Sequence, residues 1–231
     1  MAADAALRGQ AAGGLDPAGA RARVAHPRRL RKTLVDERTS WLQRVQATLF
    51  HHGVGGVPDK LLSAQGRDFL AALELPEAAR ERIEVALAMI EALDRQLAPL
   101  ERDIRALARR QAGCRELMGH YGIGPVTATS IVAELGDVSR LSASRKAVRC
   151  AGLDVGVHRS DQHSQQGKLT RQGSPHLRWA LVQAAQHGHR TTSPDRALQR
   201  AVAARAGGGR AKLTLARKIA RRAYHVLQET A

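Results

Sequence analysis

Two glycines and a proline stand together at residues 122–125, directly before an apolar run. Gly122 and Gly124 enclose one apolar residue, Ile123, and Pro125 follows at once. Glycine adopts positive φ without steric cost. Proline suits the first position of a helix, where its missing N–H would have no partner. Apolar residues then recur at helical spacing up to Leu135, so the pattern predicts a tight turn between two helices.

This predicted turn has two interpretations. In the first, it is a corner that packs a helical core. In the second, it is a helix-hairpin-helix, in which backbone N–H groups of Gly122, Ile123 and Gly124 hold a DNA phosphate at a helix N-terminus. Such a contact reads no base sequence, and it requires a small residue at Gly124, where backbone approaches phosphate. The basic composition of the chain favours the second interpretation.

Apolar periodicity predicts three helices before the turn. Residues 27–52 form an amphipathic helix, residues 61–73 a short one, and residues 76–112 a long one with a coiled-coil-like apolar stripe. Pro99 is expected to kink or split the long helix. Residues 1–27 are rich in Ala, Gly and Arg without apolar periodicity, and we expect them to be a disordered tail.

After the turn, helices are expected at residues 139–152, 177–186 and 212–228, with Ser174 as an N-cap. Residues 158–166 have no apolar periodicity and predict an exposed polar loop, and three consecutive glycines at 207–209 predict a flexible joint.

The fold class is therefore mainly α. A long, coiled-coil-like helical arm at residues 28–112 is followed by a compact, basic helical domain at residues 113–231, which contains the predicted helix-hairpin-helix.

Positive charge is concentrated in the C-terminal part. The 231 residues carry a formal net charge of +16. Residues 139–231 hold 18 Lys and Arg against four Asp and Glu, a net of +14, whereas the first 138 residues hold 19 against 17. This asymmetry indicates binding to a polyanion. With only two residues each of Trp, Tyr and Phe, stacking on single-stranded bases is not expected to be a main binding mode.

Other compositional features exclude several classes. The two cysteines, Cys114 and Cys150, are too few for a zinc site of their own or a disulfide framework. No apolar run is long enough to span a membrane and no signal-peptide core is present, so a cytoplasmic location is expected. Asp154, Asp161 and Asp195 are too scattered to indicate a metal centre, and no cofactor is expected in this chain.

One polar segment could carry nucleophilic chemistry. A serine hydroxyl can attack a DNA phosphorus if positive charge stabilises the phosphoryl group. Ser160 follows Arg159 in the predicted loop, with His158 nearby, whereas Ser164 and Ser174 are competitors. Spacing alone gives Ser160 little weight. Two further arginines, Arg171 and Arg178, flank a Gly-Ser-Pro turn and are interpreted either as surface residues or as a phosphate clamp near Ser160.

Four sequence blocks occur in a specific order. They are G-I-G-x-x-x-A from Gly122, A-G-L-D from Ala151, R-S-D from Arg159, and G-x-L-x-R-Q-G-x-x-x-L-R-W-A-L from Gly167. From residue 117 to the C-terminus, and more loosely from residue 28, the sequence resembles the C-terminal domain of the insertion-sequence transposases of the IS110/IS116/IS902 family.

The resemblance implies a DNA recombinase guided by a structured RNA, acting as a homo-oligomer, with Ser160 as the nucleophile. In that family a RuvC-like nuclease domain with metal-binding acids comes first, and this chain has no room for it. We therefore expect a fragment that is inactive alone, with divalent metal held only by the missing domain. Three readings stay open: a recombinase complemented by another chain, a nucleic-acid-binding module without activity, and a remnant of a mobile element.

Overall fold

The computed structural model describes residues 17–160 and 163–230, with side chains described for residues 27–156 and 169–230. The chain forms two compact units. One comprises residues 29–102, and the other combines the residues before it with residues 103 onward. The predicted division at residue 112 thus falls ten residues later than the boundary between the units. Of the tail predicted at residues 1–27, residues 1–16 lie outside the described residues.

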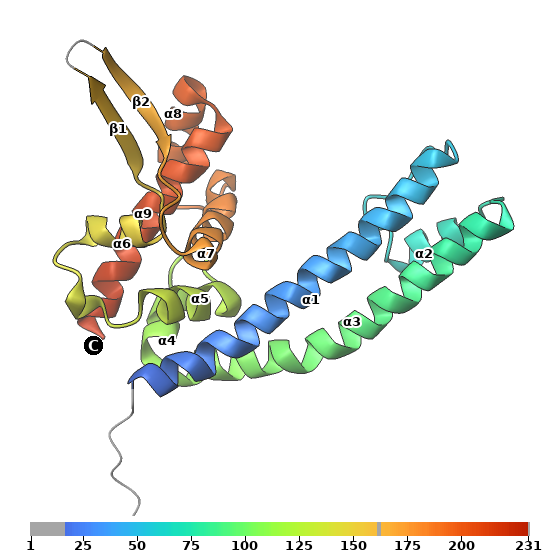
Figure 1. The fold of residues 1–231 in the computed structure, drawn as a ribbon, viewed down its shortest axis with the longest axis horizontal. Coiled ribbons are helices and arrows are strands. Elements are labelled where there is room, and N and C mark those ends of the chain that lie inside the picture. The colour runs from blue at the N-terminus through green and yellow to red at the C-terminus, as the bar shows by residue number, and fades with distance from the viewer. Residues whose placement is uncertain (1–16, 161–162, 231) are drawn as a thin grey trace, which may run out of the picture. The chain divides into compact units, whose positions relative to one another are not determined.

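The first unit is a helical hairpin, the arm. Helix α1 (Pro17–His51) and helix α3 (Glu77–Arg110) run side by side, joined through the short helix α2 (Ala64–Ala71) (Figure 1). Ion pairs between the long helices connect Arg31 to Glu101 at 2.7 Å and Arg38 to Asp94 at 2.6 Å. The buried residues of its core are Val45, Leu49, Leu61, Ile83 and Ala86.

Two expectations about the arm are corrected. Helix α1 begins at Pro17 and continues through Pro27, so residues 17–27 are helical rather than disordered. Of the two outcomes expected at Pro99, a kink or a split, the split does not occur: helix α3 continues through Pro99 for eleven further residues. A proline removes one hydrogen bond from a helix, and here the apolar stripe on both sides of Pro99, with Leu97 and Ile104 buried, keeps the two halves in one helix.

The second unit, the compact unit, contains the remaining elements (Figure 1). In chain order they are α4 (Ala112–Met118), α5 (Pro125–Leu135), the 3-10 turn η1 (Val138–Arg140), α6 (Ser144–Cys150), β1 (Val155–Ser160), β2 (His163–Leu169), α7 (Pro175–Ala185), the 3-10 turn η2 (Gln186–His189), α8 (Arg196–Ala206) and α9 (Gly208–Glu229). The mainly α fold class is confirmed.

Helix α9 forms the centre of the compact unit. It packs against α4, α6, α7 and α8. Half of its buried residues are alanines, and the full set is Ala211, Leu215, Ala216, Ile219, Ala220, Ala223, Tyr224 and Leu227. Alanine side chains allow the backbones of neighbouring helices to approach closely, so four helices pack around α9. The Tyr224 hydroxyl, buried in this core, donates to the Leu141 carbonyl at 2.9 Å.

The compact unit differs from the sequence expectations in three places. The polar loop predicted at 158–166 is an antiparallel hairpin of β1 and β2. Helix α8 was not predicted. Of the predicted glycine joint, Gly207 with φ +86° ends α8, whereas Gly208 and Gly209 already belong to α9. None of the helices in the described chain is long and apolar enough to cross a membrane.

A nearly buried carboxylate connects α8 to α9. Asp195, directly before α8, accepts hydrogen bonds from Arg222 at 2.5 and 2.9 Å and from Lys218 at 2.8 Å. Burial by itself would raise the pKa of the Asp195 carboxyl, but the hydrogen bonds from Arg222 and Lys218 outweigh it and hold this pKa below its ordinary value. The ionised form of Asp195 therefore stabilises the packing of α8 on α9.

We expect Asp195→Asn to lower the free energy of unfolding by about 1–3 kcal/mol at neutral pH, because two partly solvated cations lose their shared partner. The native pKa lies below the unfolded one, so the stabilisation is present above the unfolded pKa and is lost as the pH falls through the native pKa. Urea unfolding of both proteins at neutral and strongly acidic pH measures this. A stability difference that is the same at both pH values would contradict the assignment.

Candidate nucleic-acid interface

The predicted turn between two helices is present as the connection from α4 to α5. Gly122 has φ +83°, as expected. A Cβ atom on Gly122 would lie 2.5 Å from the carbonyl oxygen of Ala184, so the loop packs backbone to backbone against the end of α7. Gly124, by contrast, has φ −97°, and nothing lies within 4 Å of a Cβ placed there. Gly124 therefore does not use the positive φ that glycine allows, and the expectation that the fold needs a small residue there is wrong.

Gly124 is the N-cap of α5, and Pro125 is the first helical residue. The Gly124 N–H donates to the Thr127 hydroxyl oxygen at 2.8 Å, and this hydroxyl donates in turn to the Gly124 carbonyl at 2.8 Å. The Gly124 amide is therefore engaged within the turn. The amides of the first helical turn after Pro125 are those that lack an acceptor within the helix by geometry, so an anion at this N-terminus would meet Val126 and Thr127.

The turn lines a cavity of about 500 Å³. Residues 118–124 form one side of it and His187 of η2 contributes to the other. Ile123, which we expected to take part in DNA binding, has a side chain only 7% exposed and belongs to the core. The Ile123 side chain anchors the turn, and its N–H donates to the His120 carbonyl at 3.2 Å, so both groups stabilise the turn itself.

The A-G-L-D and R-Q-G blocks meet at the root of the β1–β2 hairpin. Gly152 has φ +61°, and a Cβ on it would lie 2.8 Å from the carbonyl carbon of Arg171. A Cβ on Gly173 would lie 2.5 Å from the Cys150 carbonyl oxygen. Backbone hydrogen bonds join the two blocks, from Arg171 to Gly152 at 3.2 Å and from Ser174 to Cys150 at 2.8 Å. Both glycines are therefore needed for close approach of the two chain segments.

The two candidate phosphate-clamp arginines occupy this root. Arg178 donates from Nη1 to the carbonyls of Ala151 at 2.9 Å and Arg171 at 3.4 Å, so its guanidinium ties the two blocks together. Arg171 has an exposed side chain and a φ of +51°, the one non-glycine residue with positive φ in the described chain. Its exposure is compatible with a phosphate contact.

Ser160 lies at the other end of the hairpin. It is the last residue of β1 and pairs with His163, whereas Val155 at the root pairs with Leu169. Five residue steps of about 3.3 Å separate the backbones of Val155 and Ser160, so Ser160 is about 16 Å from the root. The structure thus places Arg159 and Ser160 together on β1, but it does not bring Arg178 alongside them. Asp161 lies outside the described residues.

The two competitor serines have distinct positions. Ser164 lies on β2, paired with Arg159 across the hairpin. Ser174 is the N-cap of α7, as predicted, accepting from the Leu177 N–H at 3.1 Å. Its hydroxyl also donates to Glu134 at 2.6 Å, which leaves Ser174 committed to structure.

Glu134 was missed by the sequence reasoning. Besides the Ser174 hydroxyl, its carboxylate binds the guanidinium of Arg28, a residue that is only 4% exposed, at 2.5 Å. Burial would raise the pKa of Glu134, but the hydrogen bonds from Ser174 and Arg28 lower it below its ordinary value. The 106-residue separation of Glu134 from Arg28 leaves no local sequence signal that could have revealed the pair.

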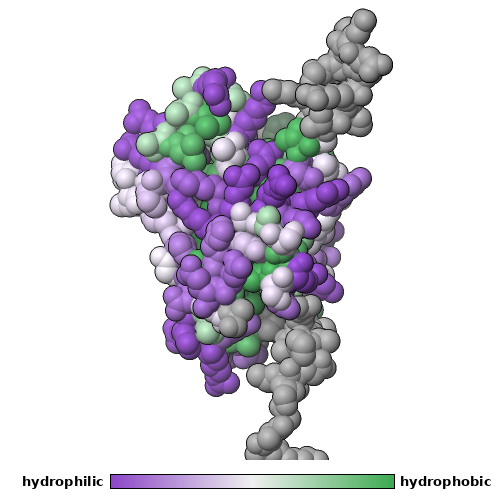
Figure 2. Space-filling view, turned by 90° about the vertical axis from the view of Figure 1, so that its left-hand side faces the viewer, coloured by the Kyte–Doolittle hydropathy of each residue, from purple (hydrophilic) through white to green (hydrophobic). Residues whose placement is uncertain are grey.

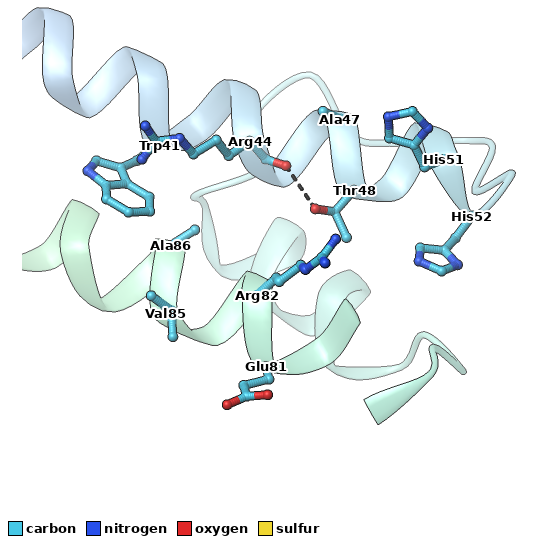
Figure 3. Close-up of a pocket in the computed structure, with 10 residues that line it drawn as sticks. All are labelled: Trp41, Arg44, Ala47, Thr48, His51, His52, Glu81, Arg82, Val85 and Ala86. Atoms are coloured by element: carbon cyan, nitrogen blue, oxygen red, sulfur yellow. Dashed lines mark hydrogen bonds between the residues drawn. The ribbon is translucent and has the colours of Figure 1, made fainter. Parts of the chain in front are cut away.

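The arm contains a cavity of about 780 Å³ between α1 and α3 (Figure 3). Trp41, Thr48 and Val85 are among its lining residues, and Arg44 lies 3.9 Å over the Trp41 ring. His51 and His52 lie at its outer end (Figure 3). No group of three His, Cys, Asp or Glu side chains close enough to hold a metal ion occurs in the described part of the chain, the arm included.

Fold and charge together define the class of protein: it is mainly α, with a helical arm and a basic compact unit that carries one tight turn and one β-hairpin. Residues 114–200, which include all four sequence blocks, match the model of the transposase family IS116/IS110/IS902. Over this stretch the chain is similar to transposases of that family, and the two relatives below are named as transposases as well.

Two relatives have related names. Over 167 residues, or 68% of this chain, the sequence is 26% identical to a Pseudomonas aeruginosa protein named "Probable family 20 transposase", covering 48% of that protein. Over 129 residues, or 54% of this chain, it is 26% identical to the Coxiella burnetii "Transposase for insertion sequence element IS1111A", covering 35% of it. The chain therefore spans about half the length of the first relative and about a third of the second.

Proposed function

We propose that this protein takes part in DNA transposition, with the compact unit binding DNA and Ser160 as the attacking group. One observation supports the proposal most directly. Within residues 114–200, which match the transposase family, the A-G-L-D and R-Q-G blocks form the root of the β1–β2 hairpin, and Ser160 lies at the other end of β1. A residue at the end of a projecting hairpin is accessible to a long polymer, in contrast to a residue in the helical core.

The chemical step transfers a phosphoryl group to serine. The Ser160 hydroxyl oxygen attacks a backbone phosphorus and loses its proton to a base. A phosphoserine diester forms, the original phosphorus–oxygen bond breaks, and the departing strand oxygen takes up a proton as a free hydroxyl. Attack by a hydroxyl of another strand reverses the step and joins that strand. Arg159, the preceding residue on β1, supplies positive charge for the phosphoryl oxygens.

As the resemblance implies, we propose that divalent metal is held by a RuvC-like nuclease domain outside this chain. In this proposal the chain contributes the serine and the surfaces that position DNA. The turn at residues 122–124 leads into the N-terminus of α5, where the amides of Val126 and Thr127 contact a phosphate, and the exposed Arg171 contributes a further cation.

A second candidate is a nucleic-acid-binding module without chemistry. The observation in its favour is that Arg178, a candidate clamp, is bonded to backbone carbonyls at the hairpin root rather than placed beside Ser160. In this reading a structured guide RNA is as suitable a ligand as DNA, and homo-oligomers would bring several binding units together.

We expect the full chain to bind duplex DNA with steep salt dependence. The net charge of +14 in residues 139–231 allows several phosphate contacts, and each contact lowers the slope of log K against log salt by about 0.9. Filter binding across a range of salt concentrations measures the slope, with a structured RNA as a parallel ligand. A flat salt dependence would contradict the proposed DNA contact, and binding of RNA alone would favour the second candidate.

A further inference from the structure

Two hollows lie beside the root of the hairpin, one towards α6 and one towards α8. The first has a volume of about 510 Å³ and is lined by Arg145, Lys146, Val148, Arg149, Asp154, Val155, Arg217 and Arg221. The second has a volume of about 600 Å³ and is lined by Val155, Leu169, Val202, Arg205, Ala206, Arg210, Leu213, Thr214 and Arg217. Val155 and Arg217 line both hollows, so the two form one continuous surface, the basic groove.

The charge of the basic groove is almost uniformly positive. Seven different Arg and Lys side chains line it, against the single carboxylate of Asp154. Five of them, namely Arg145, Lys146, Arg205, Arg210 and Arg221, are exposed and form no ion pair within the described residues. Arg149 approaches Asp154 at only 4.0 Å and is 77% exposed. The cations of the groove are therefore available to an external anion.

Arg217 is held in place at the centre of the groove. It is half-buried, and its Nε donates to the Leu153 carbonyl of the A-G-L-D block at 2.6 Å. Burial, together with the neighbouring charge of Arg221, lowers the pKa of Arg217, and Asp154 only partly offsets this. Like charges packed this closely repel each other, and an anion bound between them removes the repulsion.

The arrangement around the groove suits a polymer rather than a small anion. The cations come from α6, α8 and α9, and Val155, the first residue of β1, lines both hollows. The side of the unit that carries α6 faces the viewer in Figure 2, and its described residues are largely hydrophilic. A series of phosphates at regular spacing can contact separate cations on three helices, whereas one phosphate cannot.

We propose that the basic groove holds the phosphate backbone of duplex DNA beside the hairpin root, so that the DNA runs alongside β1 and β2. This inference rests on the proposed function in its choice of DNA as ligand, and it assigns the contact to a surface separate from the turn at residues 122–124. The groove reads no sequence, because phosphates are the same at every base. It positions the duplex for the end of the hairpin.

The test compares two triple variants of the full chain. Arg145→Gln/Arg149→Gln/Arg221→Gln removes three charges from the groove, and Arg80→Gln/Arg95→Gln/Arg102→Gln removes three from exposed positions on the arm. Fluorescence anisotropy with two duplexes of unrelated sequence measures affinity and salt slope. We expect the groove variant to lose affinity about tenfold or more for both duplexes, and the slope of log K against log salt to become less steep by about 2–3. The arm variant should stay close to the parent.

Two single-residue variants on α8 provide a second, matched comparison. Arg205 lines the groove, whereas Arg200, equally exposed on the same helix, does not. Arg205→Gln should reduce DNA affinity severalfold and Arg200→Gln should not. All these side chains are solvent-exposed, so the variants should fold, and circular dichroism with a thermal melt verifies this.

Three outcomes would overturn the groove assignment. In the first, the groove and arm variants lose equal affinity for duplex DNA. In the second, the groove variant loses affinity for an RNA duplex but not for a DNA duplex. In the third, the parent protein binds no duplex. The proposed function is decided separately, by the covalent adduct through Ser160. A parent that binds DNA independently of the groove refutes only the groove, and groove-dependent binding without an adduct refutes only the serine step.

Discussion

Covalent attachment of the protein to DNA is expected to disappear completely in Ser160→Ala. Alanine has no oxygen that can attack phosphorus, so the loss should be total rather than partial. The assay mixes the chain with labelled DNA, divalent metal and a RuvC-like half from the IS110 family supplied as a separate protein. A phosphoserine bond survives detergent, so the adduct appears as a labelled band shifted on a denaturing gel.

Matched variants separate attack from positioning. Ser164→Ala, which changes the residue paired with Arg159 across the hairpin, should leave the adduct largely intact. Arg159→Ala should weaken it by about 2–4 kcal/mol of transition-state stabilisation, comparable to the loss of an oxyanion donor. Omission of the RuvC-like half should leave no adduct. An adduct that persists in Ser160→Ala, or that maps to another residue, would refute the assignment. Because a fragment can fail to accept the supplied half, absence of an adduct in every protein is resolved by fusing the two halves in one chain.

Gly122→Val and Gly124→Val should differ strongly in stability, although the positions are two residues apart. At Gly122 a side chain meets the Ala184 carbonyl oxygen at 2.5 Å, in a backbone with φ +83°. Positive-φ strain and forced displacement of backbone together cost roughly 3–5 kcal/mol. At Gly124, with φ −97° and no atom within 4 Å, the cost should stay below about 1 kcal/mol. Urea unfolding of the two variants and the parent measures both values.

The same pair separates the two roles of the turn. If the N-terminus of α5 contacts phosphate, Gly124→Val should bind DNA less well than the parent while remaining folded, since the valine side chain occupies space beside the first-turn amides. Unchanged affinity in a folded Gly124→Val protein would place the phosphate contact elsewhere, and the basic groove would then be the main site. Equal destabilisation of both variants would contradict the turn geometry.

The hairpin shows why the site was harder to predict than the helices. Residues 158–166 are polar without alternation, and a strand is recognised in sequence by alternation of apolar and polar residues. Here β1 and β2 are paired through backbone hydrogen bonds, which any sequence can form, so the pattern indicated a loop. Helix α8 was missed for a related reason. It is short and alanine-rich, and only one of its residues, Gln199, is buried.

The sequence by itself determined the features that depend on neighbouring residues. Helical periodicity predicted the arm and α9, Gly122 predicted the positive-φ turn, Ser174 predicted the cap of α7, and the distribution of Lys and Arg predicted a basic C-terminal unit. Each of these follows from residues within a few positions of one another, where propensity and spacing act directly.

Only the tertiary structure decided which distant residues share a surface. It placed cations of α6, α8 and α9 around one groove. It showed that Arg178, a candidate phosphate clamp, donates a hydrogen bond to a backbone carbonyl. It also showed that position 122, rather than position 124, requires glycine. The physical reason is that these features depend on how closely segments far apart in the sequence approach one another. That approach is determined by the packing of helices around α9 and by contacts between backbone segments. A local sequence pattern does not predict the distance between segments far apart in the chain.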